Sequence, residues 1–159
     1  MNLSLRQSIE ERARPKRILL VEDDEATQSL FDIYARKLWC EVVSVSKATD
    51  ALEILRDANQ RVDFALLDLM LPDITGEEIF RLIRSEPISA NRPDLPVAIL
   101  SGFITDEVRQ RMKQVGFCVF IEKPHAFTEH YVLAMLKTFG IQPRIDNVTI
   151  GDGTHGSNI

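Results

Sequence analysis

The chain has 159 residues, of which 45% are hydrophobic and 27% are charged, a composition typical of one globular domain with its own core. Its formal net charge of −5 argues against nucleic acid as a partner, and no apolar run reaches the roughly 20 residues of a membrane span. The amino terminus lacks the apolar core of a secretory signal. We therefore expect a cytoplasmic protein that does not associate with membranes.

The first segment, residues 1–15, is a basic extension. Residues 1–17 contain five basic and two acidic residues, and few of the others are large and apolar. We expect this extension to be solvated and frayed. Its composition is also compatible with a short amphipathic helix that docks on a partner or on the domain itself.

An apolar run at Ile18–Val21 predicts the first strand. The helix after it is expected to bury Leu30, Ile33, Tyr34 and Leu38, which recur at spacings of three and four.

Apolar runs and amphipathic segments alternate along the rest of the chain. Alternation of this kind predicts right-handed crossovers and a parallel sheet covered by helices on both faces. Residues 16–140 are therefore expected to form one α/β domain, and residues 141–159, which lack periodicity, a flexible tail. The strands are expected at residues 18–21, 42–45, 64–67, 97–100 and 117–121, each followed by a helix.

The centre of the chain is the stretch Phe64–Gly76. Four apolar residues lead directly into Asp68, and Pro72 then interrupts the regular structure. A run of this kind is typical of a strand buried on both faces, which places Asp68 at the carboxyl end of that strand. Ligands collect at this end of an open α/β sheet. Taken alone, Asp68 could be a nucleophile, a metal ligand or a helix cap.

Polar side chains follow four of the predicted strands. Glu22 and Asp23 follow the first, Asp68 the third, Ser101 the fourth and Lys123 the fifth. Carboxylates crowded at one edge repel each other unless a cation lies among them, and oxygen ligands suit Mg²⁺. A carboxylate beside Mg²⁺ can attack phosphorus, while an ammonium group and a hydroxyl can bind the phosphoryl oxygens. The pattern thus indicates phosphoryl transfer to a carboxylate.

The register of the acidic pair has an alternative. If the first strand ended one residue later, Asp23 and Asp24 would form the pair. We favour Glu22 and Asp23, with Asp24 as the cap of the following helix.

Four segments together resemble the receiver domain of response regulators in two-component signalling. They are residues 18–23, residues 66–72 with Gly76, residues 99–102 and residues 122–124. The resemblance covers roughly residues 15–140. It implies a flavodoxin-like (βα)5 fold, three layers with a five-stranded parallel sheet in the order 2-1-3-4-5.

The resemblance also implies roles for the acidic residues. Asp68 would accept a phosphoryl group from a sensor histidine kinase or a histidine phosphotransfer protein. Mg²⁺ would be bound by Asp23 and Asp68 directly, by the backbone carbonyl of Met70, and by Glu22 through a water molecule.

A second group of residues would report the phosphorylated state. Ser101 and Lys123 would bind the phosphoryl group, and the Lys123–Pro124 peptide bond would be cis, as it typically is in this family. In this family, an aromatic residue on the fifth strand moves together with the serine, and Phe120 occupies its position. We expect phosphorylation to draw Ser101 inward and Phe120 after it.

Met70 and Phe103 lie two residues beyond Asp68 and Ser101 and would flank the path of a hydrolytic water. Both are apolar, so we expect slow loss of the phosphoryl group.

The chain resembles a stand-alone receiver, since residues 141–159 are too few to form an effector domain. Its output would be protein–protein contact, either by binding a downstream protein when phosphorylated or by passing the phosphoryl group onward in a phosphorelay. A homodimer could form through the face of helix 105–114, strand 117–121 and the last helix. It would catalyse no reaction other than its own phosphorylation and dephosphorylation.

Particular residues argue against three alternative functions. A receiver used only as a structural module is countered by the complete set of site residues. A haloacid-dehalogenase-type phosphatase would place its nucleophile after the first strand in an Asp-x-Asp pattern, which Glu22 to Asp24 do not form. A flavodoxin would need a phosphate-binding loop there, and the acidic residues would repel phosphate.

Overall fold

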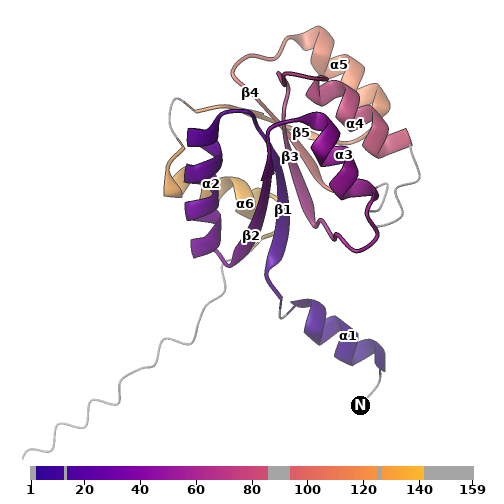
Figure 1. Ribbon diagram of the computed structural model, residues 1–159, viewed down its shortest axis with the longest axis vertical. Helices are drawn as coiled ribbons and strands as arrows, with labels where there is room; N and C mark the ends of the chain where they lie inside the picture. Colours follow the sequence, from indigo (N-terminus) through magenta and orange to yellow (C-terminus); the bar gives the residue numbers. More distant parts are fainter. Residues whose placement is uncertain (1–2, 13, 86–93, 125–126, 142–159) are drawn as a thin grey trace, which may run out of the picture.

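The structure is a computed structural model that describes residues 3–12, 14–85, 94–124 and 127–141. The expected tail, apart from Ile141, lies outside the described residues. The elements are the helices α1 (Leu3–Arg12), α2 (Glu25–Lys37), α3 (Ala48–Arg56), α4 (Gly76–Ser85), α5 (Asp106–Val115) and α6 (Glu129–Thr138), and the strands β1 (Lys16–Val21), β2 (Cys40–Val45), β3 (Phe64–Asp68), β4 (Val97–Ser101) and β5 (Val119–Glu122) (Figure 1).

The strands form one parallel sheet in the order β2-β1-β3-β4-β5. Helices α2 and α6 cover one face, and α3, α4 and α5 cover the other (Figure 1). The predicted fold class and strand order are therefore confirmed. Because every strand is parallel, all carboxyl ends lie at the same edge of the sheet.

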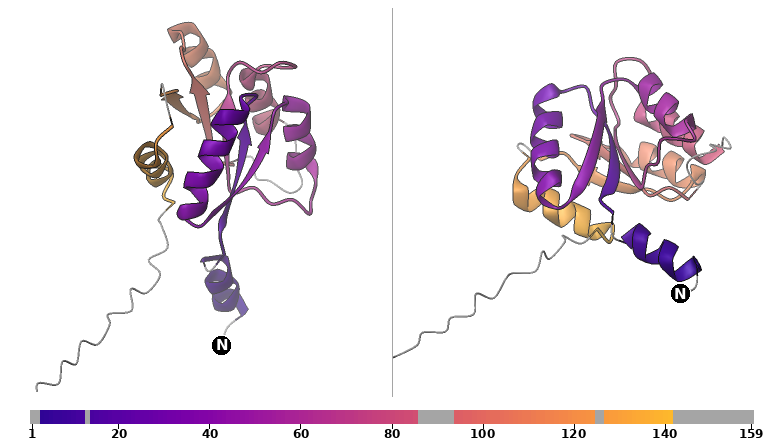
Figure 2. Two further views of the ribbon diagram at one scale, coloured as in Figure 1. Left: turned by 60° about the vertical axis from the view of Figure 1, so that its left-hand side comes forward. Right: turned by 60° about the horizontal axis from the view of Figure 1, so that its bottom comes forward.

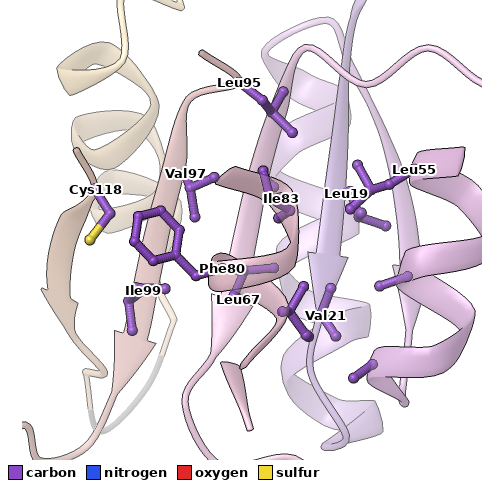
Figure 3. Packing of buried hydrophobic residues seen from close by; sticks show 14 of the residues in the cluster. Leu19, Val21, Leu55, Leu67, Phe80, Ile83, Leu95, Val97, Ile99 and Cys118 are labelled. Carbon is purple, nitrogen blue, oxygen red and sulfur yellow. The ribbon is translucent and has the colours of Figure 1, made fainter. Parts of the chain in front are cut away.

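Two cores hold the layers together, one on each face of the sheet. On the α3–α5 face, Phe80 and Ile83 of α4 pack with residues of β1, β3 and β4 (Figure 3). On the other face, Phe31 and Ala35 of α2 pack with residues of α6. Each fully buried large apolar side chain contributes about 1.5–3 kcal/mol of transfer free energy. These cores fix the strands whose ends carry the polar side chains.

The buried face of α2 differs from the prediction. Leu30 and Ile33 are 37% and 52% exposed, and Phe31 and Ala35 are buried instead, while Leu38 is buried as predicted. The error has a physical reason, because two adjacent stripes of this helix both recur at spacings of three and four. Periodicity alone does not decide between them. The prediction for Leu30 and Ile33 was wrong.

The extension expected to be frayed forms helix α1, which projects from the amino end of β1, away from the layers (Figures 1 and 2). Leu3, Leu5 and Ile9 are exposed on it. An ion pair between Arg14 and Asp63, 2.8 Å long, anchors the connection from α1 to β1. In its described residues, the extension is thus solvated, as expected, but helical from Leu3 to Arg12.

Strand β5 begins later than predicted. It starts at Val119, which is opposite Ala98 of β4, and Phe117 lies before it with 82% of its surface exposed. The apolar character of Phe117 extended the predicted strand beyond the part that pairs with β4.

Candidate phosphoacceptor site

Asp68 ends a strand that is buried along its whole length. Its side chain is held at both oxygens. The Met70 N–H donates to Oδ1 at 3.0 Å, and Lys123 Nζ donates to Oδ2 at 2.8 Å. Asp68 is only 4% exposed, so these two donors replace much of the water that a free carboxylate would bind.

Lys123 also pairs with Glu22, at 2.5 Å between Nζ and Oε2. Burial raises the pKa of Glu22, against opposing hydrogen bonds from Lys123 and the Asp24 N–H. Burial alone would lower the pKa of Lys123, but hydrogen bonds to Asp68 and Glu22 outweigh it and raise the pKa. Lys123 is therefore a stable ammonium group between two buried carboxylates.

The acidic residues that were expected at the carboxyl edge of the sheet come together there. Oxygen atoms of Glu22, Asp23 and Asp68 all lie within 4.8 Å of one another. Strand β1 ends at Val21, and Asp24 caps α2 by accepting a hydrogen bond of 2.7 Å from the Thr27 N–H. This is the register that we favoured from the sequence.

The cluster fits Mg²⁺. Its donors are carboxylate oxygens, which this hard cation prefers, and Asp23 is exposed, so waters can complete the coordination shell. Glu22 and Asp68 are buried, and a divalent cation would reduce the repulsion between them. Asp23 and Asp68 could hold the ion directly.

Ser101 lies at the end of β4, next to β3, and is buried. Its hydroxyl donates to the Phe103 carbonyl at 2.8 Å and accepts from the Phe103 N–H at 3.3 Å. The Ser101 carbonyl accepts a 2.8 Å hydrogen bond from the Lys123 N–H, which joins the ends of β4 and β5. Ser101 thus lies beside the cluster with its hydroxyl turned to its own loop.

The Lys123–Pro124 bond departs from the expectation. The described part of the chain contains no cis peptide bond, so this bond is trans. The trans form is favoured by about 0.5–1 kcal/mol even before proline. The expected cis bond was wrong.

The other predicted residues lie on β5 and on loops at the carboxyl edge of the sheet. Met70 and Phe103 are 72% and 79% exposed, and both belong to loops that leave the carboxyl edge of the sheet. Phe120 is partly buried on β5, on the α3–α5 side of the sheet.

Two contacts near the site were missed by sequence reasoning. The guanidinium carbon of Arg109 lies 5.0 Å from the centroid of the Phe120 ring. Asp73 accepts hydrogen bonds from the first two backbone N–H groups of α3. Neither residue has a periodic signal, although Lys47, which lacks an acceptor side chain, shows that α3 needs a cap from elsewhere.

Comparison with known families decides what kind of domain this is. The response regulator receiver domain matches residues 18–134, which is most of the chain. The chain belongs to the response regulator receiver domain family. The receiver domain begins in β1 and includes every residue of the cluster described above.

Three relatives illustrate the similarity of this receiver domain to known ones. The polar-differentiation response regulator DivK of Brucella anthropi is 26% identical over 110 residues, which cover 69% of this chain and 85% of DivK. The phosphorylated cyanobacterial phytochrome response regulator RcpA is 28% identical, with a TM-score of 0.65 over 79% of this chain and 91% of RcpA.

The third relative is the receiver domain of the sensor histidine kinase PA1611 from Pseudomonas aeruginosa, whose structure holds a magnesium ion in the active-site cleft. It is 26% identical, with a TM-score of 0.63 over 78% of this chain and 96% of that domain. Other relatives are longer, and this chain spans 14% to 55% of their length. Within the described part of the chain, every helix is too short or too polar to span a lipid bilayer.

Proposed function

We propose that Asp68 accepts a phosphoryl group from a histidine kinase or a histidine phosphotransfer protein. The observation that carries this proposal is the position of Asp68, which is buried at the carboxyl edge of the sheet, 2.8 Å from Lys123 and within the acidic cluster. In the transfer, the bond between phosphorus and the donor imidazole nitrogen breaks while a bond forms between phosphorus and an Asp68 oxygen. The electron pair of the broken bond stays on the imidazole.

Mg²⁺ is part of this proposal. Asp23, Asp68 and the Met70 carbonyl would bind the ion, and Glu22 would act through a water molecule. When bound, the ion neutralises charge on the transferring phosphoryl group. Lys123 would bind one phosphoryl oxygen, since its ammonium group already faces the acceptor carboxylate.

The phosphorylated state would be read by Ser101 and Phe120. The Ser101 hydroxyl donates a hydrogen bond to the Phe103 carbonyl. A phosphoryl oxygen is a stronger acceptor than this carbonyl, so the hydroxyl would turn toward it. Phe120 would then follow Ser101 inward and change the surface over β5.

The output would be a protein contact on the face of α5, β5 and α6. A mostly apolar groove of about 470 Å³ lies between β5 and α6 there. A downstream protein or a second copy of the chain would dock on this face, and the domain would turn over no substrate besides its own phosphoryl group. The groove is lined by Val119, Phe120, Ile121, Glu122, Tyr131, Ala134, Met135 and Thr138.

Labelling with a small phosphodonor tests the proposal. Wild type, Asp68→Asn and the control Asp24→Asn are incubated with acetyl phosphate and Mg²⁺, and intact mass is measured. We expect one phosphoryl group on the wild type and on Asp24→Asn, whose carboxylate caps α2, and none on Asp68→Asn. Equal labelling of wild type and Asp68→Asn would contradict the assignment.

The same experiment separates the alternatives. A purely structural module would remain unlabelled in all three proteins. A phosphatase would release inorganic phosphate continuously, in large excess over the protein.

A further inference from the structure

Helix α3 lacks a cap from its own sequence. It begins at Ala48, and Lys47 at the N-cap position makes no side-chain cap hydrogen bond. Asp73 supplies the missing acceptor from another part of the chain. Its Oδ1 accepts from the Ala48 N–H and its Oδ2 from the Thr49 N–H, both at 2.9 Å.

Asp73 belongs to the loop that leaves the acceptor strand. The Leu69 N–H donates to the Leu100 carbonyl at 3.0 Å, and the Gly76 N–H donates to the Leu69 carbonyl at 3.1 Å, so the ends of this loop are fixed. Leu71 and Ile74, on either side of Asp73, are partly buried against the core that α3 shares. The loop is therefore a compact unit with Asp73 at its outer end.

The inner end of the same loop contacts the acceptor. The Met70 N–H donates to Oδ1 of Asp68 at 3.0 Å. A contiguous path of hydrogen bonds and one short loop thus connects the acceptor carboxylate with the first turn of α3. The path runs opposite to the one through Ser101 and Phe120, which leads toward β5.

We propose that Asp73 is a positioning residue that couples the acceptor site to the first turn of α3. The proposal rests on the proposed function of Asp68. A group that binds Asp68 competes for the oxygen held by the Met70 N–H and displaces the loop. Because the Asp73 carboxylate accepts hydrogen bonds from two adjacent N–H groups, displacement of the loop changes the hydrogen bonds at Ala48 and Thr49.

The ionisation of Asp73 agrees with this role. Burial alone would raise its pKa, but hydrogen bonds from the backbone N–H groups of Thr49 and Ala48 outweigh it and hold the pKa far below the ordinary value. A carboxylate that stays ionised is the better partner for the positive end of a helix dipole.

Amide NMR of the whole chain tests the coupling. Beryllium fluoride with Mg²⁺ is used as the probe, since it mimics a phosphoryl group on a carboxylate. In the wild type, we expect the amide signals of Ala48 and Thr49 to shift along with that of Lys123. In Asp73→Ala, the Lys123 signal should still shift, while the response of Ala48 and Thr49 is lost.

Mg²⁺ titration gives a second measurement. Without the hydrogen bonds from Asp73 to α3, the loop that carries Met70 is less firmly held. Asp73→Ala should therefore bind Mg²⁺ about fivefold more weakly, a factor at the low end of coupling between linked sites. Asp50→Ala is the matched control, because Asp50 is an acidic residue in the same first turn of α3. It should keep both the amide response and the Mg²⁺ affinity.

Asp73→Asn is a second variant that tests the coupling if Asp73→Ala does not fold. Its amide NH2 group is a donor and replaces one of the two carboxylate oxygens, which now each accept from a different N–H group, so a reduced response is expected. If Lys123 shifts in the wild type but Ala48 and Thr49 do not, the coupling is refuted while the proposed function stands. If none of the three amides responds in the wild type, the proposed function itself fails.

Discussion

Gly76 lies so close to Asp68 that a Cβ atom added to it would be 2.2 Å from the Asp68 carbonyl oxygen. The neighbour is backbone, which cannot move aside as a flexible side chain would. The first residue of α4 therefore packs directly on the peptide of the proposed acceptor, and only glycine permits this approach.

We predict that Gly76→Ala lowers the free energy of unfolding by about 3 kcal/mol, the upper end of typical overpacking costs. It should also slow labelling of Asp68 by acetyl phosphate, because relief of the clash displaces the acceptor peptide. Urea unfolding and intact mass measure the two effects. Gly102→Ala is the control, since a Cβ there would meet nothing within 4 Å. Equal stability of the two variants would refute the prediction.

Met70 and Phe103, 72% and 79% exposed, lie on the two loops beside the acidic cluster. If they shield the aspartyl phosphate from water, a polar residue that binds the attacking water should shorten its lifetime. A hydrogen bond of about 1 kcal/mol corresponds to roughly a fivefold faster rate. We predict this change for Met70→Asn, measured as loss of the phosphoryl group after the donor is removed.

Phe117→Asn is the matched control for this lifetime. Phe117 is equally exposed, at 82%, but lies before the amino end of β5. Its substitution should leave the lifetime unchanged. A lifetime of Met70→Asn equal to that of the wild type would exclude Met70 as a barrier to water.

The fold could be predicted because each buried strand is a continuous apolar run that ends in a polar residue. Runs such as the one before Asp68 are fully buried, so their pattern depends little on which helix covers them. The strand order followed from the family resemblance. The convergence of Glu22, Asp23 and Asp68 then needed only the parallel topology.

The helix faces and side-chain contacts could not be predicted in the same way. In α2, the stripe of Phe31 and Ala35 competes with the stripe of Leu30 and Ile33, and only packing against the sheet and α6 decides between them. Trp39, just beyond the end of α2, has a φ of 59°, in the left-handed region that favours glycine. The contacts of Asp73 with α3 join distant segments and leave no local signal.

Arg109 on α5 lies over the Phe120 ring, with 5.0 Å between the guanidinium carbon and the ring centroid. A cation–π contact at a partly exposed site contributes about 0.5–1 kcal/mol. It stabilises the observed orientation of Phe120, so Arg109→Leu should ease its inward movement. We predict that this variant binds beryllium fluoride about threefold more tightly, a factor that corresponds to such an energy.

Arg109→Lys is the control for this contact, because it keeps a cation above the ring. Its affinity for beryllium fluoride should lie between those of the wild type and Arg109→Leu. Weaker binding by Arg109→Leu than by the wild type would show that Arg109 supports the bound state instead.

Asp63 anchors the connection between α1 and β1 and makes stability depend on pH. Its carboxylate accepts from Arg14 Nη2 at 2.8 Å and from the Arg17 N–H at 2.9 Å. Burial alone would raise its pKa, but these hydrogen bonds outweigh it and lower the pKa below the ordinary value of 3.8. The folded state therefore binds this proton less readily than the unfolded state does. The stability that Asp63 contributes is present above about pH 4 and is lost as the pH falls through the folded-state pKa.

We predict that Asp63→Asn lowers the free energy of unfolding by about 2 kcal/mol at pH 7, the range of hydrogen bonds to a charged group. The difference from the wild type should persist down to about pH 5 and shrink below about pH 4, because the wild-type carboxylate then becomes protonated. Urea unfolding across this range measures it, and Asp57→Asn controls for the loss of one negative charge. A difference that stayed constant down to pH 2 would mean that the anchor does not depend on the ionised carboxylate, and that Asp63 acts through packing alone.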